Sequence, residues 1–168
     1  MTASPDRLFA YLDELDIPHT TVQHEATFTV AEGRGLKASL PGGHTKNLFM
    51  KDKDGVIVLI SAHADNQLKL NQLHKLIGTR RLSFASAELM EEVLGVVPGS
   101  VTGFALMNDT GRRVRFILDA ALEAYEEVNF HPLVNTATTR VSLANFKRFV
   151  AATGHDLTVI DFTELIAP

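Results

Sequence analysis

The feature that most limits the fold of this 168-residue chain is the irregular order of its strand-like and helix-like segments. His44–Met50 and Val56–Ser61 are rich in β-forming residues, and the turn-forming sequence Asp52-Lys53-Asp54-Gly55 between them predicts a hairpin. Apolar residues at helical spacing predict helices at Pro5–Leu15, Leu68–Ile77, Ser86–Leu94 and Ser142–Val150. Because hairpins and helices do not alternate regularly, we expect an α/β fold with a mixed sheet and surrounding helices, not a doubly wound parallel sheet.

The sequence also predicts several shorter strands and the start of one more helix. Runs of β-forming residues predict strands at His19–Gln23, Arg81–Phe84, Val101–Met107, Arg113–Leu118, Glu126–Phe130 and Leu157–Ile160. Thr29–Glu32 has the spacing of a capping box and predicts the start of another helix.

Composition limits the class of protein. A chain of this length with 45% hydrophobic residues suits one domain over residues 1–168. No apolar run is long enough to span a membrane, and Met1–Pro5 lacks the pattern of a secretory signal. The absence of cysteine excludes disulfides and thiolate nucleophiles and fits a cytoplasmic location. The net charge of -4 argues against a long nucleic-acid footprint such as DNA binding requires, so any RNA contact is expected to be local.

Several familiar catalytic patterns are missing from the sequence. It has no phosphate-binding loop, no dinucleotide fingerprint and no Gly-x-Ser-x-Gly elbow. The seven histidines are scattered, and no pair has the spacing of a helical zinc site. We therefore expect neither a cofactor nor a metal.

Three segments remain as candidates for chemistry. Gly95–Ser100 is a glycine- and proline-containing loop whose N–H groups could hold a carbonyl oxygen, although a plain helix-to-strand turn has the same composition. Lys46 and Asn47 lie in an otherwise apolar strand, where lysine could meet a phosphate, although an exposed lysine at a strand end is a common alternative. In Asn129–Thr139, Pro132 restricts the backbone of His131, and the segment could line a polar pocket or form a self-satisfied loop.

Taken together, these segments resemble the YbaK/prolyl-tRNA-editing family. Gly95–Thr102 is similar to the glycine-proline loop of that family, and His44–Leu48 is similar to its lysine strand. Phe130–Thr139 resembles the free-standing branch that removes alanine from tRNA for proline. The resemblance extends over about Leu8 to Ile160.

The resemblance implies a strongly curved, largely antiparallel mixed sheet and a pocket for the terminal adenosine with its aminoacyl group. By position, the resemblance implies that Lys46 would contact the phosphate or ribose near that adenosine, and that the loop would hold the aminoacyl ester through backbone N–H groups. The expected catalytic residues are Lys46, Gly95, Pro98 and Gly99. The expected substrate-binding residues are Asn47, Ser100, His131, Asn135 and Thr136.

The function implied is trans-editing hydrolysis of mischarged aminoacyl-tRNA, foremost Ala-tRNA(Pro), by water and without a protein nucleophile. The expected partners are the tRNA acceptor end and prolyl-tRNA synthetase. The alternatives are a Cys-tRNA(Pro) deacylase and a non-catalytic module that binds tRNA or a synthetase. Gly103 departs from the family pattern, because relatives often have proline there, and a looser strand is expected after the loop.

Overall fold

The computed structural model describes residues 4–25 and 40–166, and the helix expected to open at Thr29–Glu32 lies outside these residues. The helices are α1 (Pro5–Glu14), α3 (Leu73–Ile77), α4 (Ala87–Leu94) and α5 (Leu143–Ala152). The strands are β1 (Thr20–Gln23), β2 (Gly43–Lys51), β3 (Ile57–His63), β4 (Ser83–Phe84), β5 (Val114–Asp119), β6 (Glu127–Phe130), β7 (Ala137–Ser142) and β8 (Leu157–Ile160). Short 3-10 helices are η1 (Leu70–Gln72), η2 (Gly103–Asn108), η3 (Ala120–Ala124) and η4 (Thr163–Leu165).

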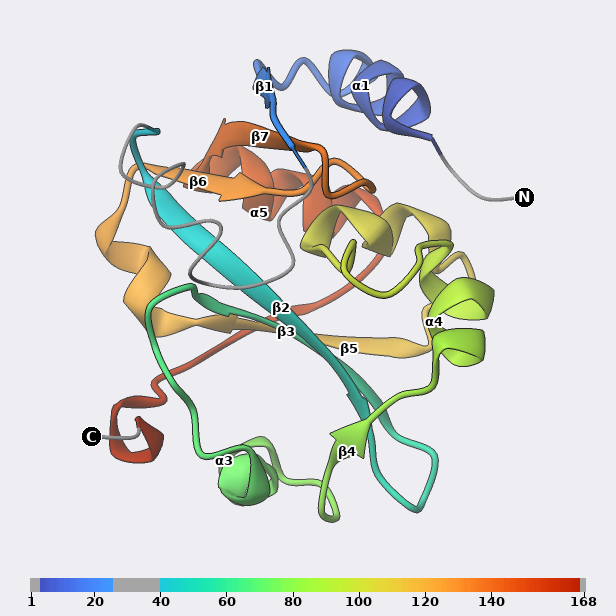
Figure 1. Ribbon diagram of the computed structural model, residues 1–168, viewed down its shortest axis with the longest axis vertical. Coiled ribbons are helices and arrows are strands. Elements are labelled where there is room, and N and C mark those ends of the chain that lie inside the picture. The colour runs from blue at the N-terminus through green and yellow to red at the C-terminus, as the bar shows by residue number, and fades with distance from the viewer. Residues whose placement is uncertain (1–3, 26–39, 167–168) are drawn as a thin grey trace.

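The described strands form one mixed sheet, as the sequence predicts. The strand order is β1-β7-β6-β2-β3-β5-β8, and β4 pairs with the end of β2. Antiparallel pairing joins β1 to β7, β7 to β6 and β2 to β3, whereas β2–β6, β3–β5 and β5–β8 are parallel. Strand direction changes strongly across the sheet, since β2 runs diagonally away from β6 and crosses β5 at a steep angle (Figure 1).

The two faces of the sheet are covered by separate apolar clusters. Phe49 of β2 packs in a large cluster with residues of α1, α4, η2 and α5. Its neighbour Met50 packs in a smaller cluster with residues of α3 and η4. This follows from the alternation of side chains along a strand, which sends successive residues of the apolar run Leu48–Met50 to opposite faces.

The predicted helix ends are largely confirmed. The side chains of Ser4, Ser86 and Ser142 each accept a hydrogen bond from a backbone N–H in the first turn of α1, α4 and α5. The helix expected over Leu68–Ile77 is shorter, because η1 and α3 share the segment, but it ends as expected at Ile77, and Gly78 follows with φ 83°.

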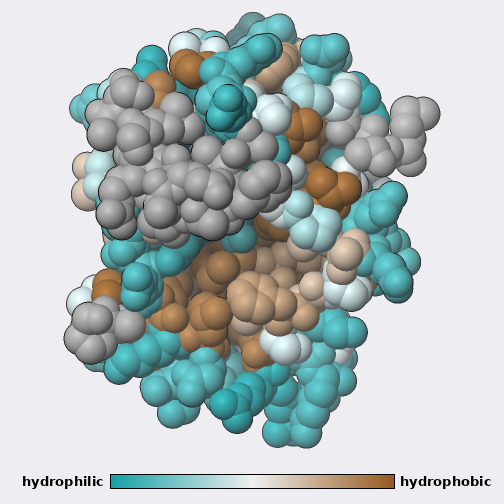
Figure 2. All heavy atoms as spheres, viewed as in Figure 1, coloured by the Kyte–Doolittle hydropathy of each residue, from teal (hydrophilic) through white to brown (hydrophobic). Residues whose placement is uncertain are grey.

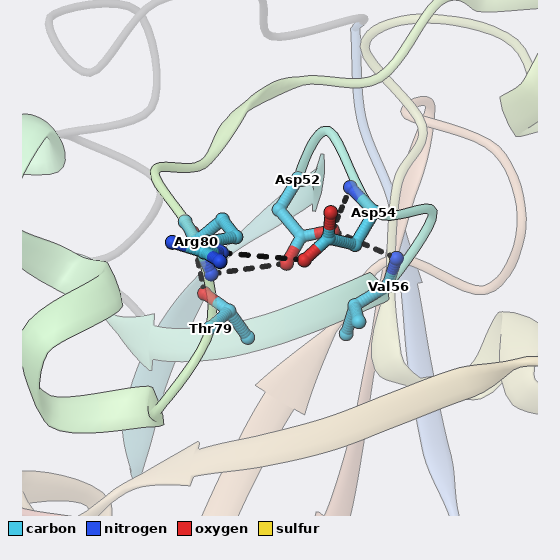
Figure 3. A network of polar contacts seen from close by, with 5 residues as sticks. All are labelled: Asp52, Asp54, Val56, Thr79 and Arg80. Atoms are coloured by element: carbon cyan, nitrogen blue, oxygen red, sulfur yellow. Dashed lines mark hydrogen bonds and ion pairs between the residues drawn. The ribbon is translucent and has the colours of Figure 1, made fainter.

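The predicted hairpin turn is confirmed, and the Asp52 side chain connects it to a neighbouring segment. One Asp52 carboxylate oxygen accepts the N–H groups of Asp54 and Val56, both at 2.9 Å, and the other accepts the Arg80 N–H at 3.0 Å (Figure 3). Burial alone would raise the pKa of the Asp52 carboxyl, but these N–H donors outweigh it and lower the pKa. Asp52 thereby joins the β2–β3 hairpin to the connection between α3 and β4.

One prediction for the segments around the candidate site is wrong. Val101–Met107 is not a strand, because Gly103–Asn108 forms the 3-10 helix η2. An apolar run of this length can be a buried strand or a buried helical turn, and periodicity does not separate them. The polar segment after His131, for which the sequence left a pocket lining or a loop open, leads into the strand β7 between β1 and β6.

The expectation of a loose segment at Gly103 is also wrong. Phe104 is fully buried, with ring centroids 5.3 Å from both Phe130 and Phe149. A Cβ atom at Gly103 would lie 2.8 Å from the Phe146 ring and 3.0 Å from the Phe130 ring. Gly103 is therefore required by close packing, and η2 is pressed against the end of β6.

We expect Gly103→Ala to destabilise the protein by about 1–3 kcal/mol, because the added methyl group overpacks a cluster of fully buried rings. Urea unfolding monitored by circular dichroism measures the change. Gly111→Ala is the matched control, since a Cβ there meets its nearest atom at 3.7 Å, and its effect should stay within about 0.5 kcal/mol. Equal unfolding free energies for the two variants would contradict this packing account.

Candidate active site

The candidate site begins where β2 and β6 separate. These parallel strands share the register pairs Gly43–Val128 and His44–Asn129. The Asn129 amide donates to the carbonyls of Pro41 and Gly43 at 2.9 and 3.3 Å and fixes the start of β2. The Thr45 hydroxyl then donates to the Asn129 carbonyl at 2.8 Å, so a side chain makes the next contact between the strands. Beyond this point β2 runs away from β6 (Figure 1).

Lys46 and His131 both follow this last register pair by two residues, Lys46 along β2 and His131 just past the end of β6. The structure therefore places them next to the separation of the same two strands. Lys46 is half-buried, and its ammonium donates to the backbone carbonyl of Asn66. A lysine held in this way presents a positive charge at a defined place rather than at the end of a freely moving stem.

Asn47 faces away from Lys46, because the two residues are consecutive in a regular strand. Its side-chain oxygen accepts a hydrogen bond from Ser61, a fully buried residue opposite it on β3. Its amide nitrogen lies 3.4 Å from the Thr45 hydroxyl. The structure thus does not bring Lys46 and Asn47 to the same face of the sheet, and Asn47 adjoins the candidate site through Thr45.

The ring of His131 has a defined tautomer in its neutral form. Its Nδ1 atom lies 3.2 Å from the Ala137 carbonyl, which can only accept, so Nδ1 carries the hydrogen. Nε2 is then the acceptor of the neutral ring. Burial lowers the pKa of His131 and nearby His24 lowers it further, although the hydrogen bond to Ala137 opposes both. His131 is therefore suited to accept a hydrogen bond from an O–H or N–H group near neutral pH.

His24 also lies beside the candidate site, although no sequence pattern singles it out. It lies just after β1, its backbone N–H donates to the Thr136 carbonyl at 2.9 Å, and its Nε2 lies 2.8 Å from the Thr138 hydroxyl. These contacts place it beside the start of β7 and close enough to influence His131. Only the pairing of β1 with β7 brings it there, and no local pattern indicates that pairing.

The glycine-proline loop contains a tight turn at its tip. The Ser100 N–H donates to the Val97 carbonyl at 3.0 Å, and Gly99 has φ 93°. Proline followed by a glycine with positive φ fits a type II β-turn, in which the central peptide group points out of the turn. The N–H of that peptide belongs to Gly99, and no described residue accepts a hydrogen bond from it. The Gly99 amide is the loop's candidate donor to an ester oxygen.

The other predicted loop residues have structural roles. Gly95 ends α4 with φ 66°, its N–H donates to Glu91, and a Cβ there would lie 2.9 Å from the Asn108 amide. The Ser100 N–H is used by the turn and Pro98 has no N–H, so neither offers a backbone donor. The loop leads through Gly103 to the Phe130 ring, and Figure 1 shows it beside the end of β6.

Asn135 and Thr136 lie in the connection from β6 to β7, with Asn135 half-buried and Thr136 exposed. The Thr136 carbonyl accepts the His24 N–H, which leaves its side chain as the group that a ligand could meet. These two residues are therefore on the same short connection as His131.

An apolar surface adjoins this region. Figure 2 shows apolar side chains gathered over β2 and extending toward α3, with hydrophilic residues around them. Leu48 shares the Lys46 face of β2 and is partly buried at the edge of the smaller cluster. Phe84, opposite Met50 on β4, is 60% exposed. A small apolar group bound near Lys46 would therefore meet hydrocarbon on one side.

A separate hollow of ≈ 450 Å³ lies at the start of β5 and β8, and Arg112, Arg115, His155 and Thr158 are among its lining residues. The register of β3 with β5 places Lys46 near the opposite end of β5, about 16 Å away along a strand of this length. His155 is buried there with Nε2 2.8 Å from Asp109, as a satisfied structural contact. The hollow is therefore distinct from the candidate site.

Comparison with known proteins identifies the family and the fold. The family model described as "Aminoacyl-tRNA editing domain" matches residues 24–149. The chain is 43% identical over 160 residues to "Prolyl-tRNA synthetase associated domain-containing protein 1" of Xenopus laevis, covering 92% of this chain and 95% of the relative. It is 31% identical over 155 residues to "Prolyl-tRNA editing protein ProX" of Acetoanaerobium sticklandii, covering 92% and 94%. A crystal structure described as a candidate trans-editing enzyme for prolyl-tRNA synthetase superposes with a TM-score of 0.71 at 23% identity, covering 100% of this chain and 99% of that one, which shows the shared fold.

The fold and the matched span define the class of the protein as an aminoacyl-tRNA deacylase, a hydrolase of the ester between amino acid and tRNA. The chain belongs to the aminoacyl-tRNA editing domain family. Among the described residues, no helix is both long and apolar enough to cross a membrane.

The lowered pKa of His131 predicts a pH dependence of stability. The unfolded chain takes up a proton near the ordinary pKa of about 6.5, whereas folded His131 resists protonation. The contribution of His131 to the free energy of unfolding is therefore fully present above the ordinary histidine pKa, and it is lost as the pH falls toward the lower pKa of the folded state. We expect the unfolding free energy of the wild type to fall more than that of His131→Gln between pH 7.5 and 5.5, as measured by urea titration. Parallel curves for the two proteins would show that His131 is not held neutral by the fold.

Proposed function

We propose that this protein acts in trans on mischarged Ala-tRNA(Pro) and hydrolyses the ester that joins alanine to the terminal adenosine. The observation that carries the proposal is that Lys46 and His131 each lie two residues beyond the last register pair of β2 and β6, while the loop that contains Gly99 leads through Gly103 to the Phe130 ring at the end of β6. Lys46 supplies the cation, neutral His131 supplies the acceptor, and Gly99 supplies the backbone N–H. The names of relatives that refer to prolyl-tRNA editing support the choice of tRNA.

In this proposal a water molecule attacks the ester carbonyl, and no side chain forms a covalent intermediate. The water oxygen bonds to the carbonyl carbon, the bond to the ribose oxygen breaks, and that oxygen leaves with a proton from the water. The family resemblance implies that a ribose hydroxyl of the substrate helps to activate this water. Lys46 attracts the phosphate or ribose oxygens, and the Gly99 N–H stabilises the negative charge that develops on the carbonyl oxygen.

The Nε2 atom of His131 accepts a hydrogen bond from an O–H or N–H of the substrate and orients the aminoacyl adenosine. Asn47, Ser100, Asn135 and Thr136 would adjoin the bound group from the strand, the loop and the β6–β7 connection. Pro98 and Gly95 act on the shape of the loop. The expected partners are the tRNA acceptor end and prolyl-tRNA synthetase, and the expected location is the cytoplasm.

Size exclusion would set the preference for alanine. A pocket can reject a larger side chain by steric clash more strongly than it can favour one extra methylene group, which is worth about 1–3 kcal/mol. The partly buried Leu48, on the Lys46 face of β2, offers a hydrocarbon surface to a methyl group. Removal of cysteine from the same tRNA is the second candidate, because a thiol adds only one heavy atom to the methyl group.

A deacylation panel on one tRNA(Pro) charged with alanine, cysteine, serine or proline tests this proposal. We expect alanine to be released at least about a hundredfold faster than proline, after subtraction of hydrolysis in buffer. Catalytic amounts of protein should give many turnovers. Stoichiometric protection of the ester would instead indicate a non-catalytic binding module, and equal loss of alanine and proline would contradict selection by size.

Lys46→Ala should lower kcat/KM for Ala-tRNA(Pro) by about tenfold or more, because a close cationic contact to the substrate is lost. Lys51→Ala is the matched control, since Lys51 is an exposed lysine at the far end of the same strand. An equal loss of kcat/KM in the two variants would mean that activity depends on the total charge of the protein and not on the position of Lys46. The measurement is steady-state release of labelled alanine by each folded variant.

A further inference from the structure

The position of Lys46 depends on a turn that follows β3. The Asn66 N–H donates to the His63 carbonyl at 3.0 Å, which closes the turn His63–Asn66. The Asp65 N–H donates to the His63 ring at 3.1 Å, and the Ala64 N–H donates to the His44 carbonyl at 2.8 Å. The turn is therefore fixed both internally and to β2, next to the strand pair that Lys46 adjoins.

Asp119 anchors the first and last residues of this turn. It lies at the end of β5 and is 1% exposed. One carboxylate oxygen accepts the His63 N–H at 3.0 Å and the Asn66 side-chain amide at 3.2 Å. The other oxygen accepts the Ala121 N–H at 2.9 Å at the start of η3. Three neutral donors from two segments thus converge on one buried carboxylate.

The carbonyl of Asn66 in turn accepts a hydrogen bond from the Lys46 ammonium. A lysine side chain has four rotatable bonds, and fixing it against solvent costs conformational entropy. A carbonyl that is already held in place reduces the number of positions that the ammonium occupies before substrate binds. Such preorganisation favours catalysis, because the charge need not be reoriented during the reaction.

We propose that Asn66 and Asp119 are positioning residues that hold the Lys46 ammonium where the substrate binds. The chain of contacts runs from the Asp119 carboxylate to the Asn66 amide, through the Asn66 carbonyl, to Lys46. This inference rests on the proposed function, since it assigns Asn66 and Asp119 a role in the same site. Their proposed role is to act through Lys46 and not on the substrate itself.

Asn66→Ala is the sharpest test, because it removes the amide that binds Asp119 but keeps the backbone carbonyl that binds Lys46. Gln67→Ala is the matched control, since Gln67 is the exposed next residue in the chain. The first readout is independent of activity: the 15N–1H signal of the Lys46 ammonium, assigned by its loss in Lys46→Ala. We expect this signal to shift and to exchange faster with water in Asn66→Ala but not in Gln67→Ala. An unchanged signal in Asn66→Ala overturns the proposal.

The second readout is kinetic. We expect Asn66→Ala to lower kcat/KM for Ala-tRNA(Pro) by about tenfold in the wild-type background, but by less than about twofold when Lys46 is already alanine. Single-turnover assays with excess protein make the slow variant measurable. An equal loss in both backgrounds would indicate a general structural effect and overturn the proposal. If Asn66→Ala does not fold, Asn66→Ser, which retains a hydroxyl donor, takes its place with the same outcomes.

The two proposals can fail separately. If the wild type deacylates none of the four aminoacyl-tRNAs, the proposed function fails, whereas the ammonium signal still reports whether Asn66 holds Lys46. If the wild type is active and the ammonium signal does not respond to Asn66→Ala, only the positioning role is lost.

Discussion

The early separation of β2 from β6 is the constraint on which the candidate site depends. Two parallel strands that stayed paired would bury the residues after His44 and Asn129 in the sheet. Instead the Thr45 hydroxyl donates a hydrogen bond to the Asn129 carbonyl, and the backbone pairing of the two strands ends there. Lys46 follows His44 by two residues along β2, and His131 follows Asn129 by two residues, just past the end of β6. In the proposed function, this separation is where a ligand reaches the Lys46 ammonium and the His131 imidazole.

The packing around this separation makes the candidate site rigid. Gly103 allows η2 to lie against the rings of Phe130 and Phe146, and Phe130 directly precedes His131. The same contact places Gly103, which follows Gly99 by four residues, against the end of β6. On the other side, Asp119 and the turn after β3 support Lys46. The three predicted segments are thus connected through the core rather than through flexible side chains, which suits a site that must hold a small aminoacyl group.

Local chemistry could be predicted from the sequence where it is decided by neighbouring residues. Val97-Pro98-Gly99-Ser100 specifies its own turn, and the serines before α1, α4 and α5 specify the helix starts. The η2 segment was mistaken for a strand because its apolar residues pack on all sides, which removes any periodicity. The strand β7 was missed because Thr138 and Thr139, although polar, are buried between β1 and β6.

Residues that act through distant contacts could not be found in this way. His24 reaches the site only through β1 pairing with β7, and Asp119 reaches Lys46 only through the end of the β3–β5 ladder. Conversely, Lys46 and Asn47 are adjacent in sequence but point to opposite faces of the sheet. Residue patterns singled out the three segments and the family resemblance joined them into one expected site, whereas the structure shows how differently the residues within each segment are used.

The most direct test of the central claim, that Lys46, His131 and Gly99 form one site, is an NMR titration with a non-hydrolysable substrate analogue. Adenosine carrying alanine through a 3′-amide in place of the ester is a suitable probe. The account predicts that the Lys46 ammonium, the His131 ring and the Gly99 amide shift together and saturate with one dissociation constant. Shifts confined to the hollow around Arg112 and His155, with these three signals unchanged, would contradict it.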